Sequence, residues 1–135
     1  MTDNSPLPVG AFTFVLHGAG GDLAKRKIIP ALAHLAKSGY FSAESRIIFA
    51  QRETLSPEQA LAQVDAFLKA AGDEAARESI PALLPYLHTL QVVLGTPESC
   101  RAMANAVAGS PEPVVHYAAL PSSRFIDLIN CIPTV

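Results

Sequence analysis

The chain has 135 residues, of which 50% are hydrophobic and 16% charged, and its formal net charge is −2. This length is that of one ordinary domain, and the high apolar content excludes an intrinsically disordered chain. The near-neutral charge argues against a nucleic-acid-binding protein, which usually carries a strongly basic surface. No apolar run approaches the roughly 20 residues of a membrane helix, and the N-terminus lacks the basic start and apolar stretch of a signal peptide. Two cysteines, Cys100 and Cys131, do not amount to a disulfide framework, so a reducing cytoplasm is the expected compartment.

The first half of the chain alternates between strand and helix patterns. Apolar residues recur at every second position over residues 12–17, which predicts a strand that ends at Gly18. Helical spacing follows over residues 28–36, and Pro30 places the start of the regular helix near itself, because proline is tolerated only in the first turn. Gly39 is expected to end this helix in the left-handed conformation. The apolar run at 46–50 predicts a second strand.

The second half repeats the alternation. A capping box at 56–59 predicts a helix to Gly72, and a less regular helix is expected over 73–84, where Pro81 interrupts the pattern. The remaining elements are a strand at 87–94, a helix from 96, a strand at 114–119 and a short helix at 122–130. This order predicts an α/β domain over residues 10–135, with a mostly parallel sheet of about four strands and helices on both faces. Residues 1–9 are expected to form a flexible arm.

The glycine-rich segment after the first strand is the strongest candidate for a binding site. Glycines at this position let the backbone approach a phosphate, and the start of the next helix offers unpaired N–H groups to an anion. The turn also has a purely steric explanation, which remains open, whereas a Walker P-loop is excluded because no Gly-Lys-Ser/Thr follows. The candidate cofactor-binding residues of this segment are Gly18, Ala19, Gly20, Gly21, Asp22, Leu23 and Ala24.

Three further side chains are candidates for the same ligand. Lys25 follows the glycines and could attract a pyrophosphate, although a short run of charges is often only a solvated face. Arg52 comes just after the second strand, where an arginine favours the 2′-phosphate of NADP over the ribose hydroxyl of NAD. Its alternative is a surface arginine without a ligand, and Glu53 beside it weakens the inference. Tyr117, near the end of the fourth strand, is expected either to pack against a nicotinamide ribose or to belong to the core.

With these residues in view, the chain resembles the amino-terminal coenzyme domain of the glucose-6-phosphate dehydrogenase family, a Rossmann-like domain. The family's run is approximately G-A-S/T-G-D-L-A-K-K/R-K-L/I-I/Y-P, and residues 18–30 read GAGGDLAKRKIIP. Residues 46–52, RIIFAQR, compare with the family's R-I-I-G-x-A-R and place Arg52 on the arginine associated with NADP. Residues 117–122, YAALPS, compare with Y-L-A-L-P-P. The chain departs from the family at Gly20, where a hydroxyl residue is usual, and at the second proline.

The resemblance implies a cofactor, NADP, and a reaction, the oxidation of glucose 6-phosphate to 6-phosphogluconolactone in the pentose phosphate pathway. It carries over no catalytic residue, because no position here matches the family's histidine base, its aspartate partner or its E-K-P-x-G lysine. The first hypothesis is therefore a domain that binds NADP without turnover. The second is a degenerate, non-enzymatic module that acts by protein association. The open edge of its last strand is expected to pair either with a second copy of the chain or with the remainder of the enzyme, which this sequence lacks.

Overall fold

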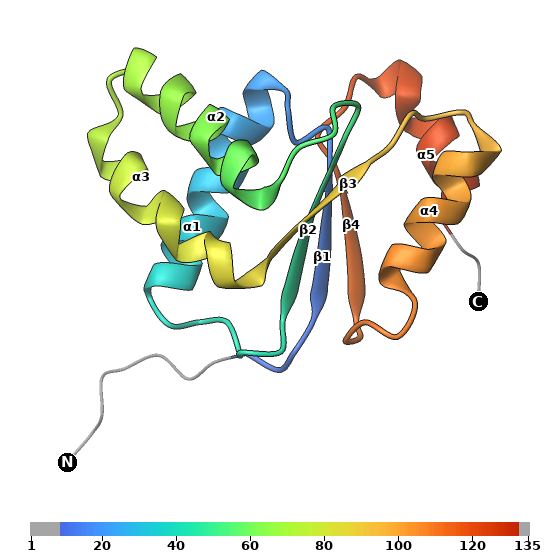
Figure 1. Ribbon diagram of the computed structural model, residues 1–135, viewed down its shortest axis with the longest axis horizontal. Helices are drawn as coiled ribbons and strands as arrows, with labels where there is room; N and C mark the ends of the chain where they lie inside the picture. The colour runs from blue at the N-terminus through green and yellow to red at the C-terminus, as the bar shows by residue number, and fades with distance from the viewer. Residues whose placement is uncertain (1–8, 133–135) are drawn as a thin grey trace.

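The protein is built around a four-stranded parallel sheet with a layer of helices on each face (Figure 1). The computed structural model describes residues 9–132. The sheet has the order β3-β2-β1-β4, and all three strand pairs are parallel. Its strands are β1 (Thr13–His17), β2 (Arg46–Gln51), β3 (Leu87–Gln91) and β4 (Val114–Ala118). The predicted α/β fold, with about four strands and helices on both faces, is confirmed.

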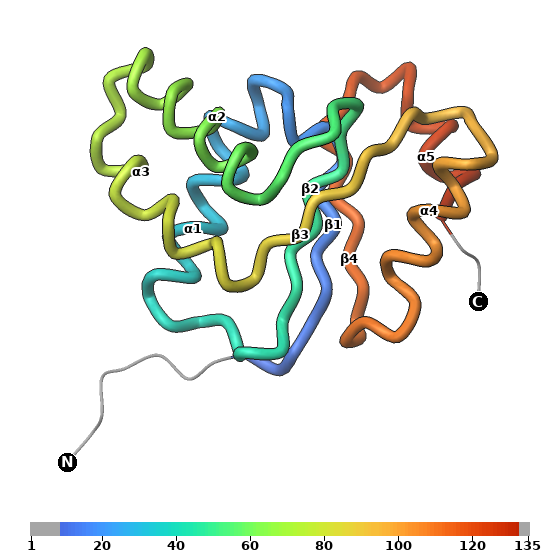
Figure 2. Tube along the Cα trace, viewed as in Figure 1, coloured from blue at the N-terminus to red at the C-terminus, as the bar shows by residue number. Residues whose placement is uncertain are grey.

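The helical segments follow the predicted alternation with the strands. They are η1 (Ala24–Ile28), α1 (Ile29–Lys37), α2 (Pro57–Ala70), α3 (Glu74–Ser79), η2 (Ile80–Tyr86), α4 (Pro97–Val107), η3 (Ser122–Arg124) and α5 (Phe125–Cys131). The helices η1, α1, α2, α3 and η2 lie on one side of the sheet, and α4 and α5 lie on the other (Figure 1). Because parallel strands all run the same way, the loops that follow them gather at one end of the sheet (Figure 2).

Two separate hydrophobic cores hold these layers together. On the α1–α2 side, Leu16, Ile47 and Phe49 pack among buried residues of α1, α2 and η2. On the α4–α5 side, Val15 and Ile48 pack against buried residues of the helices there. Strands β1 and β2 supply both cores from alternate residues, which explains why their sequences are almost continuously apolar.

Local signals in the sequence set most of the helix ends. At the start of α2, Ser56 accepts a hydrogen bond from the Gln59 N–H, and the Gln59 side chain accepts one from the Ser56 N–H, so the predicted capping box is present. Pro30 lies in the first turn of α1, directly after the π-helical segment η1. Gly39 follows the end of α1 with a φ of 83°. The predictions made from Pro30 and Gly39 are therefore confirmed.

The regions with prolines are less regular than the sequence predicted. The single helix expected over 73–84 is divided into α3 and the 3₁₀ helix η2, which begins directly before Pro81 and contains Pro85. Proline has no N–H to donate and clashes with the preceding turn, so the α-helix cannot continue through it. Most of the predicted arm lies outside the described residues, but the N–H of Val9 donates to the carbonyl of Tyr40 at 2.9 Å.

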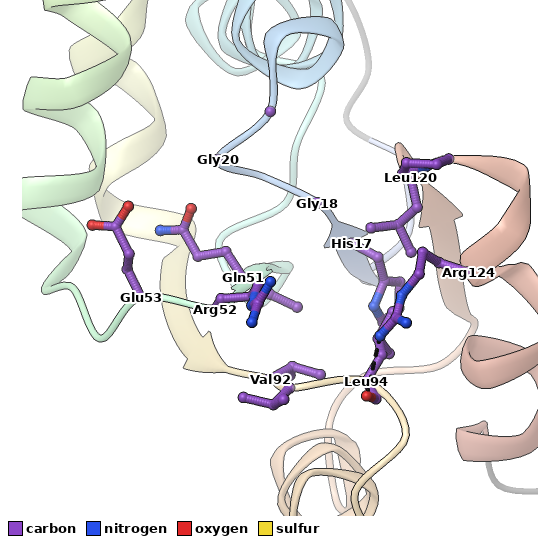
Figure 3. A pocket seen from close by; sticks show the side chains of 14 residues that line it. His17, Gly18, Gly20, Gln51, Arg52, Glu53, Val92, Leu94, Leu120 and Arg124 are labelled. Carbon is purple, nitrogen blue, oxygen red and sulfur yellow. Dashed lines mark hydrogen bonds between the residues drawn. The ribbon is translucent and has the colours of Figure 1, made fainter.

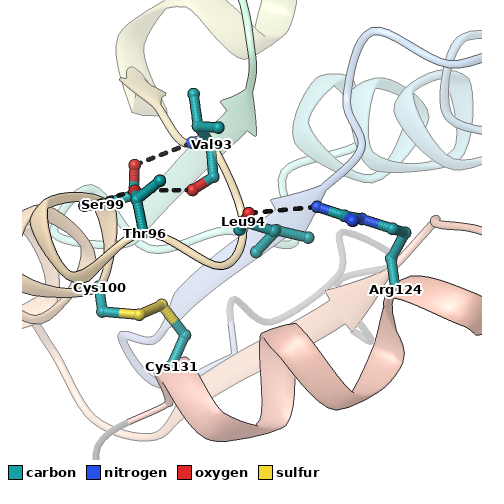
Figure 4. Close-up of a disulfide and its surroundings, with 7 residues drawn as sticks. All are labelled: Val93, Leu94, Thr96, Ser99, Cys100, Arg124 and Cys131. Atoms are coloured by element: carbon teal, nitrogen blue, oxygen red, sulfur yellow. Dashed lines mark hydrogen bonds between the residues drawn. A yellow bond between two sulfur atoms is a disulfide. The ribbon is translucent and has the colours of Figure 1, made fainter.

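The two cysteines, which were not expected to form a disulfide framework, are bonded to each other: Cys100 and Cys131 form a disulfide (Figure 4). They are 31 residues apart in sequence, yet their Cα atoms are 4.9 Å apart. Cys100 lies in α4 and Cys131 ends α5, and both belong to the core on the α4–α5 side of the sheet. Their spacing in the sequence gave no sign of this, because the contact arises only when two helices pack on the same face.

Candidate functional site

A cavity of about 610 Å³ lies at the carboxyl end of the sheet (Figure 3). It is lined by residues that follow each of the four strands, together with His17 and Ala50 from the strands themselves. The lining residues are Gly18, Gly20 and Gly21 after β1; Gln51, Arg52 and Glu53 at and after the end of β2; Val92, Val93 and Leu94 after β3; and Leu120, Pro121 and Arg124 after β4. This volume is in the usual range for a small-molecule or cofactor site, and its position is where ligands bind in open α/β sheets.

The glycine turn after β1 is held tightly against both neighbouring strands. Gly18 has a φ of +78°, and its N–H donates to the carbonyl of Ala50 at 3.0 Å. A Cβ atom on Gly18 would collide with the backbone oxygen of Ala119. The N–H of Gly21 returns to the carbonyl of Gly18 at 3.0 Å and closes the turn. Only glycine therefore fits at position 18, for conformational and for steric reasons.

Gly20 shows how the cavity differs from the family pattern. A Cβ atom on Gly20 would lie 2.5 Å from Oε1 of Gln51. The amide of Gln51 therefore occupies the room that a side chain at position 20 would need, and it lines the cavity in its place. An amide can both donate and accept hydrogen bonds, as a hydroxyl can. The sequence alone does not point to Gln51, because nothing near it in the chain shows that it lies against Gly20.

A buried histidine, His17, and a half-buried one, His116, form a pair beside the cavity. His17 is 2% exposed, and its Nε2 lies 2.9 Å from Nδ1 of His116 on β4. Burial, and then the charge of His116, lower the pKa of His17 to about 4, and burial also lowers the pKa of His116. Both rings are consequently neutral at pH 7, with one donating its N–H to the other. The Nδ1 atom of His17 has no hydrogen-bond partner among the described residues.

Two arginines bring positive charge to the cavity. Arg52, predicted from the sequence, is an exposed residue in the segment that follows β2, and Glu53 lies next to it. Arg124, which the sequence analysis did not select, comes at the end of η3, directly before α5. Its Nη2 donates to the carbonyl of Leu94 at 3.2 Å, and its Nη1 lies 3.3 Å from Oδ2 of Asp127.

The structure brings only some of the predicted residues to the cavity wall. Gly18, Gly20, Gly21 and Arg52 line it. The others lie around the glycine turn or on β4 and are not lining residues: Ala19 and Ala24 are buried beneath the turn, Asp22 and Leu23 are exposed at its end, Lys25 is half-buried in η1, and Tyr117 stacks on Phe14 with ring centroids 6.1 Å apart. Tyr117 and Val115 project from the side of β4 opposite to His116, since neighbouring residues of a strand point to opposite faces.

The family model described as the NAD-binding domain of glucose-6-phosphate dehydrogenase matches residues 15–135. The chain belongs to the glucose-6-phosphate dehydrogenase family. It is 32% identical over 114 residues to the glucose-6-phosphate 1-dehydrogenase of Helicobacter pylori, a match that covers 84% of this chain and 26% of the relative. It is 45% identical over 53 residues to that of Rhizobium meliloti, covering 39% of this chain and 11% of the relative.

A solved structure of a glucose-6-phosphate dehydrogenase in complex with glucose 6-phosphate is also similar. It superposes with a TM-score of 0.68 at 28% identity, over 89% of this chain and 26% of that one. The chain thus spans about a quarter or less of the length of these glucose-6-phosphate dehydrogenases. The cavity lies at the carboxyl ends of the strands, where open α/β sheets bind dinucleotides, and Gly18, Gly20 and Gly21 line it with backbone atoms alone, which suits a phosphate group.

Replacing Gly18 with alanine is expected to destabilise the fold more than the same change at Gly72. Both glycines have positive φ angles, but a Cβ atom on Gly72 would meet nothing within 4 Å. Gly72→Ala should therefore cost only the conformational strain, about 1–2 kcal/mol, whereas Gly18→Ala adds a collision with a backbone oxygen. Urea unfolding of the two variants measures the difference. Equal losses would mean that the backbone near Ala119 moves aside without cost.

The His17 pair is expected to make stability depend on pH. The folded-state pKa of His17 is about 4 and the ordinary value is 6.5, so between these values the unfolded chain binds a proton that the folded protein excludes. The free energy of unfolding should therefore fall as the pH is lowered from 6.5 to 4. His17→Gln should flatten this slope, and the exposed control His34→Gln should keep it. Urea unfolding across this range checks both, and identical slopes in all three proteins would contradict the assignment.

Proposed function

We propose that this chain binds NADP in the cavity at the end of the sheet. The observation that carries the proposal is that Arg52 and the glycine turn line the same cavity from neighbouring strands, β2 and β1. In a dinucleotide-binding fold, the pyrophosphate lies at the turn after the first strand and the adenosine ribose lies at the end of the second. A guanidinium at that second position pairs with the 2′-phosphate that distinguishes NADP from NAD.

The reaction that we propose for an enzyme containing this domain is the one that names its family. Glucose 6-phosphate would be oxidised to 6-phosphogluconolactone, with hydride transfer to NADP. This chain on its own would bind the coenzyme without turnover, because none of its residues matches the general base or the lysine of the family. The cytoplasm is the compartment we propose, where thiol reductants would compete with the Cys100–Cys131 disulfide.

Calorimetric titration with NADP and NAD tests this function. We expect NADP to bind more tightly than NAD, and Arg52→Ala to remove most of this preference by weakening NADP alone. Loss of one phosphate contact with a charged group is expected to cost about 1.5–3 kcal/mol, or roughly tenfold to a hundredfold in affinity. No binding of either coenzyme at millimolar concentration would exclude the proposal, and an unchanged preference in Arg52→Ala would exclude the role of Arg52.

A second candidate function, association through the edge of the sheet, is favoured by the surface of β4 and α5. Strand β4 is an edge strand, and its Val115 and Tyr117 side chains are 44% and 39% exposed. On α5, Ile126 and Ile129 are 60% and 62% exposed. An unpaired strand with apolar side chains beside it can accept another strand. We propose that two copies of this chain associate through this region.

Sedimentation velocity over a range of protein concentrations tests the association. We expect a dimer that dissociates on dilution and that Ile129→Asp weakens, because a carboxylate would lose its hydration in the interface. Leu84→Asp is the matched control, since Leu84 is 42% exposed but lies in η2, which leads into β3 at the opposite edge of the sheet. A monomer at every concentration would exclude this function, as would equal weakening by both variants.

A further inference from the structure

The cavity has one arginine on each side of the glycine turn. In the sheet order β3-β2-β1-β4, the strand that ends at the glycine turn lies between the strands that precede Arg52 and Arg124. Neighbouring strands are roughly 5 Å apart, so the backbone segments after β2 and β4 lie roughly 10 Å from each other across the turn. The proposed role of Arg52 accounts for the charge on the β2 side only. Arg124 on the β4 side has no role in that proposal.

Arg124 is held in position by neighbours that leave part of its guanidinium group unused. Nη2 donates to the carbonyl of Leu94 (Figure 4), and Nη1 is paired with Asp127. A guanidinium group has five N–H donors, and these contacts account for two of them. The side chain is 45% exposed and lines the cavity, so the remaining donors can reach a ligand. Figure 3 shows Arg124 at the cavity wall, and Figure 4 marks its hydrogen bond to Leu94.

The segments that carry Arg124 and its partner are themselves fixed. The loop with Leu94 is closed by Val93, whose N–H donates to Oγ of Ser99 at 2.9 Å and whose carbonyl accepts from Oγ1 of Thr96 at 2.9 Å. The helix α5, which follows Arg124, is joined to α4 by the disulfide and buries Leu128 in the core. A side chain held this way loses little freedom when it binds a ligand, which favours a binding role.

We propose that Arg124 binds the phosphate of the nicotinamide mononucleotide half of the coenzyme, an inference that rests on the proposed function. A dinucleotide lies across the two halves of such a sheet, with the adenosine over β2 and the pyrophosphate at the turn after β1. The second nucleotide therefore extends toward β4, where Arg124 is the cation on the cavity wall. The fork of a guanidinium group matches two oxygens of one phosphate, which makes arginine well suited to this contact.

The two arginines consequently read different parts of the ligand. Arg52 reads the 2′-phosphate, which NADP and 2′,5′-ADP carry and NAD lacks. Arg124 reads the nicotinamide half, which NADP and NAD carry and 2′,5′-ADP lacks. These three ligands separate the two roles, and they also separate a binding role of Arg124 from a purely structural one that joins α5 to the Leu94 loop. A structural role would affect all three ligands alike.

Calorimetric titration of the wild-type chain, Arg124→Gln and Arg52→Ala with NADP, NAD and 2′,5′-ADP is the test. We expect Arg124→Gln to weaken NADP and NAD by a similar factor, about tenfold or more, and to leave 2′,5′-ADP unchanged. Arg52→Ala should weaken NADP and 2′,5′-ADP and leave NAD unchanged. Arg124→Lys should fall between wild type and Arg124→Gln, since it keeps the charge and loses the fork.

A second variant separates the ligand contact from the local structure. Asp127→Asn removes the ion pair of Arg124 but leaves the guanidinium in place, so we expect wild-type or tighter binding of NADP and NAD. Wild-type affinities for all three ligands in Arg124→Gln would overturn the inference, and so would an equal loss for all three. Failure of the wild-type chain to bind any of them would instead overturn the proposed function, together with the inference that rests on it.

Discussion

The close approach of the glycine turn to the strands on either side is the constraint on which the site depends. The N–H of Gly18 is bonded to the end of β2, and the space beside its Cα is taken by the backbone of Ala119, just after β4. A side chain at this position would push the turn away from β4. Because the turn stays close, the chain can leave β1, pass the mouth of the cavity and enter the helical segment η1–α1 within a few residues. The cavity floor, its glycine wall and the start of that helix are thus fixed together.

Charge in this site is placed around a neutral floor. Burial keeps His17 and His116 uncharged at pH 7, so the positive groups of the cavity are the exposed guanidiniums of Arg52 and Arg124. A charged histidine here would be costly to desolvate, which is why burial favours the neutral rings. Under the proposals above, the two guanidiniums contact the ligand at separate places, Arg52 at the 2′-phosphate and Arg124 at the pyrophosphate.

The apolar surface of β4 and α5 is a different kind of feature. Strands β1 and β2 are covered on both faces and contribute to two cores, but Val115 and Tyr117 of β4 remain exposed on the α1 side of the sheet. The relatives that the chain matches are about four to nine times as long as their matched parts, as coverages of 26% and 11% imply. A coenzyme-binding cavity and an unpaired strand edge are compatible features of one domain, because the cavity lies at the carboxyl end of the sheet and the unpaired edge runs along β4.

The sequence by itself determined the alternation of strands and helices, the capping box at Ser56, the end of α1 at Gly39, the glycine turn and the position of Arg52. These features depend on residues close together in the chain, through side-chain periodicity and the backbone preferences of glycine and proline. Tertiary structure decided the His17–His116 pair, the Cys100–Cys131 disulfide, the room for Gln51 beside Gly20 and the bond from Arg124 to Leu94. Each of these joins segments about 30 to 100 residues apart. Such contacts follow from the order of strands in the sheet and the packing of helices on it, which no local pattern encodes.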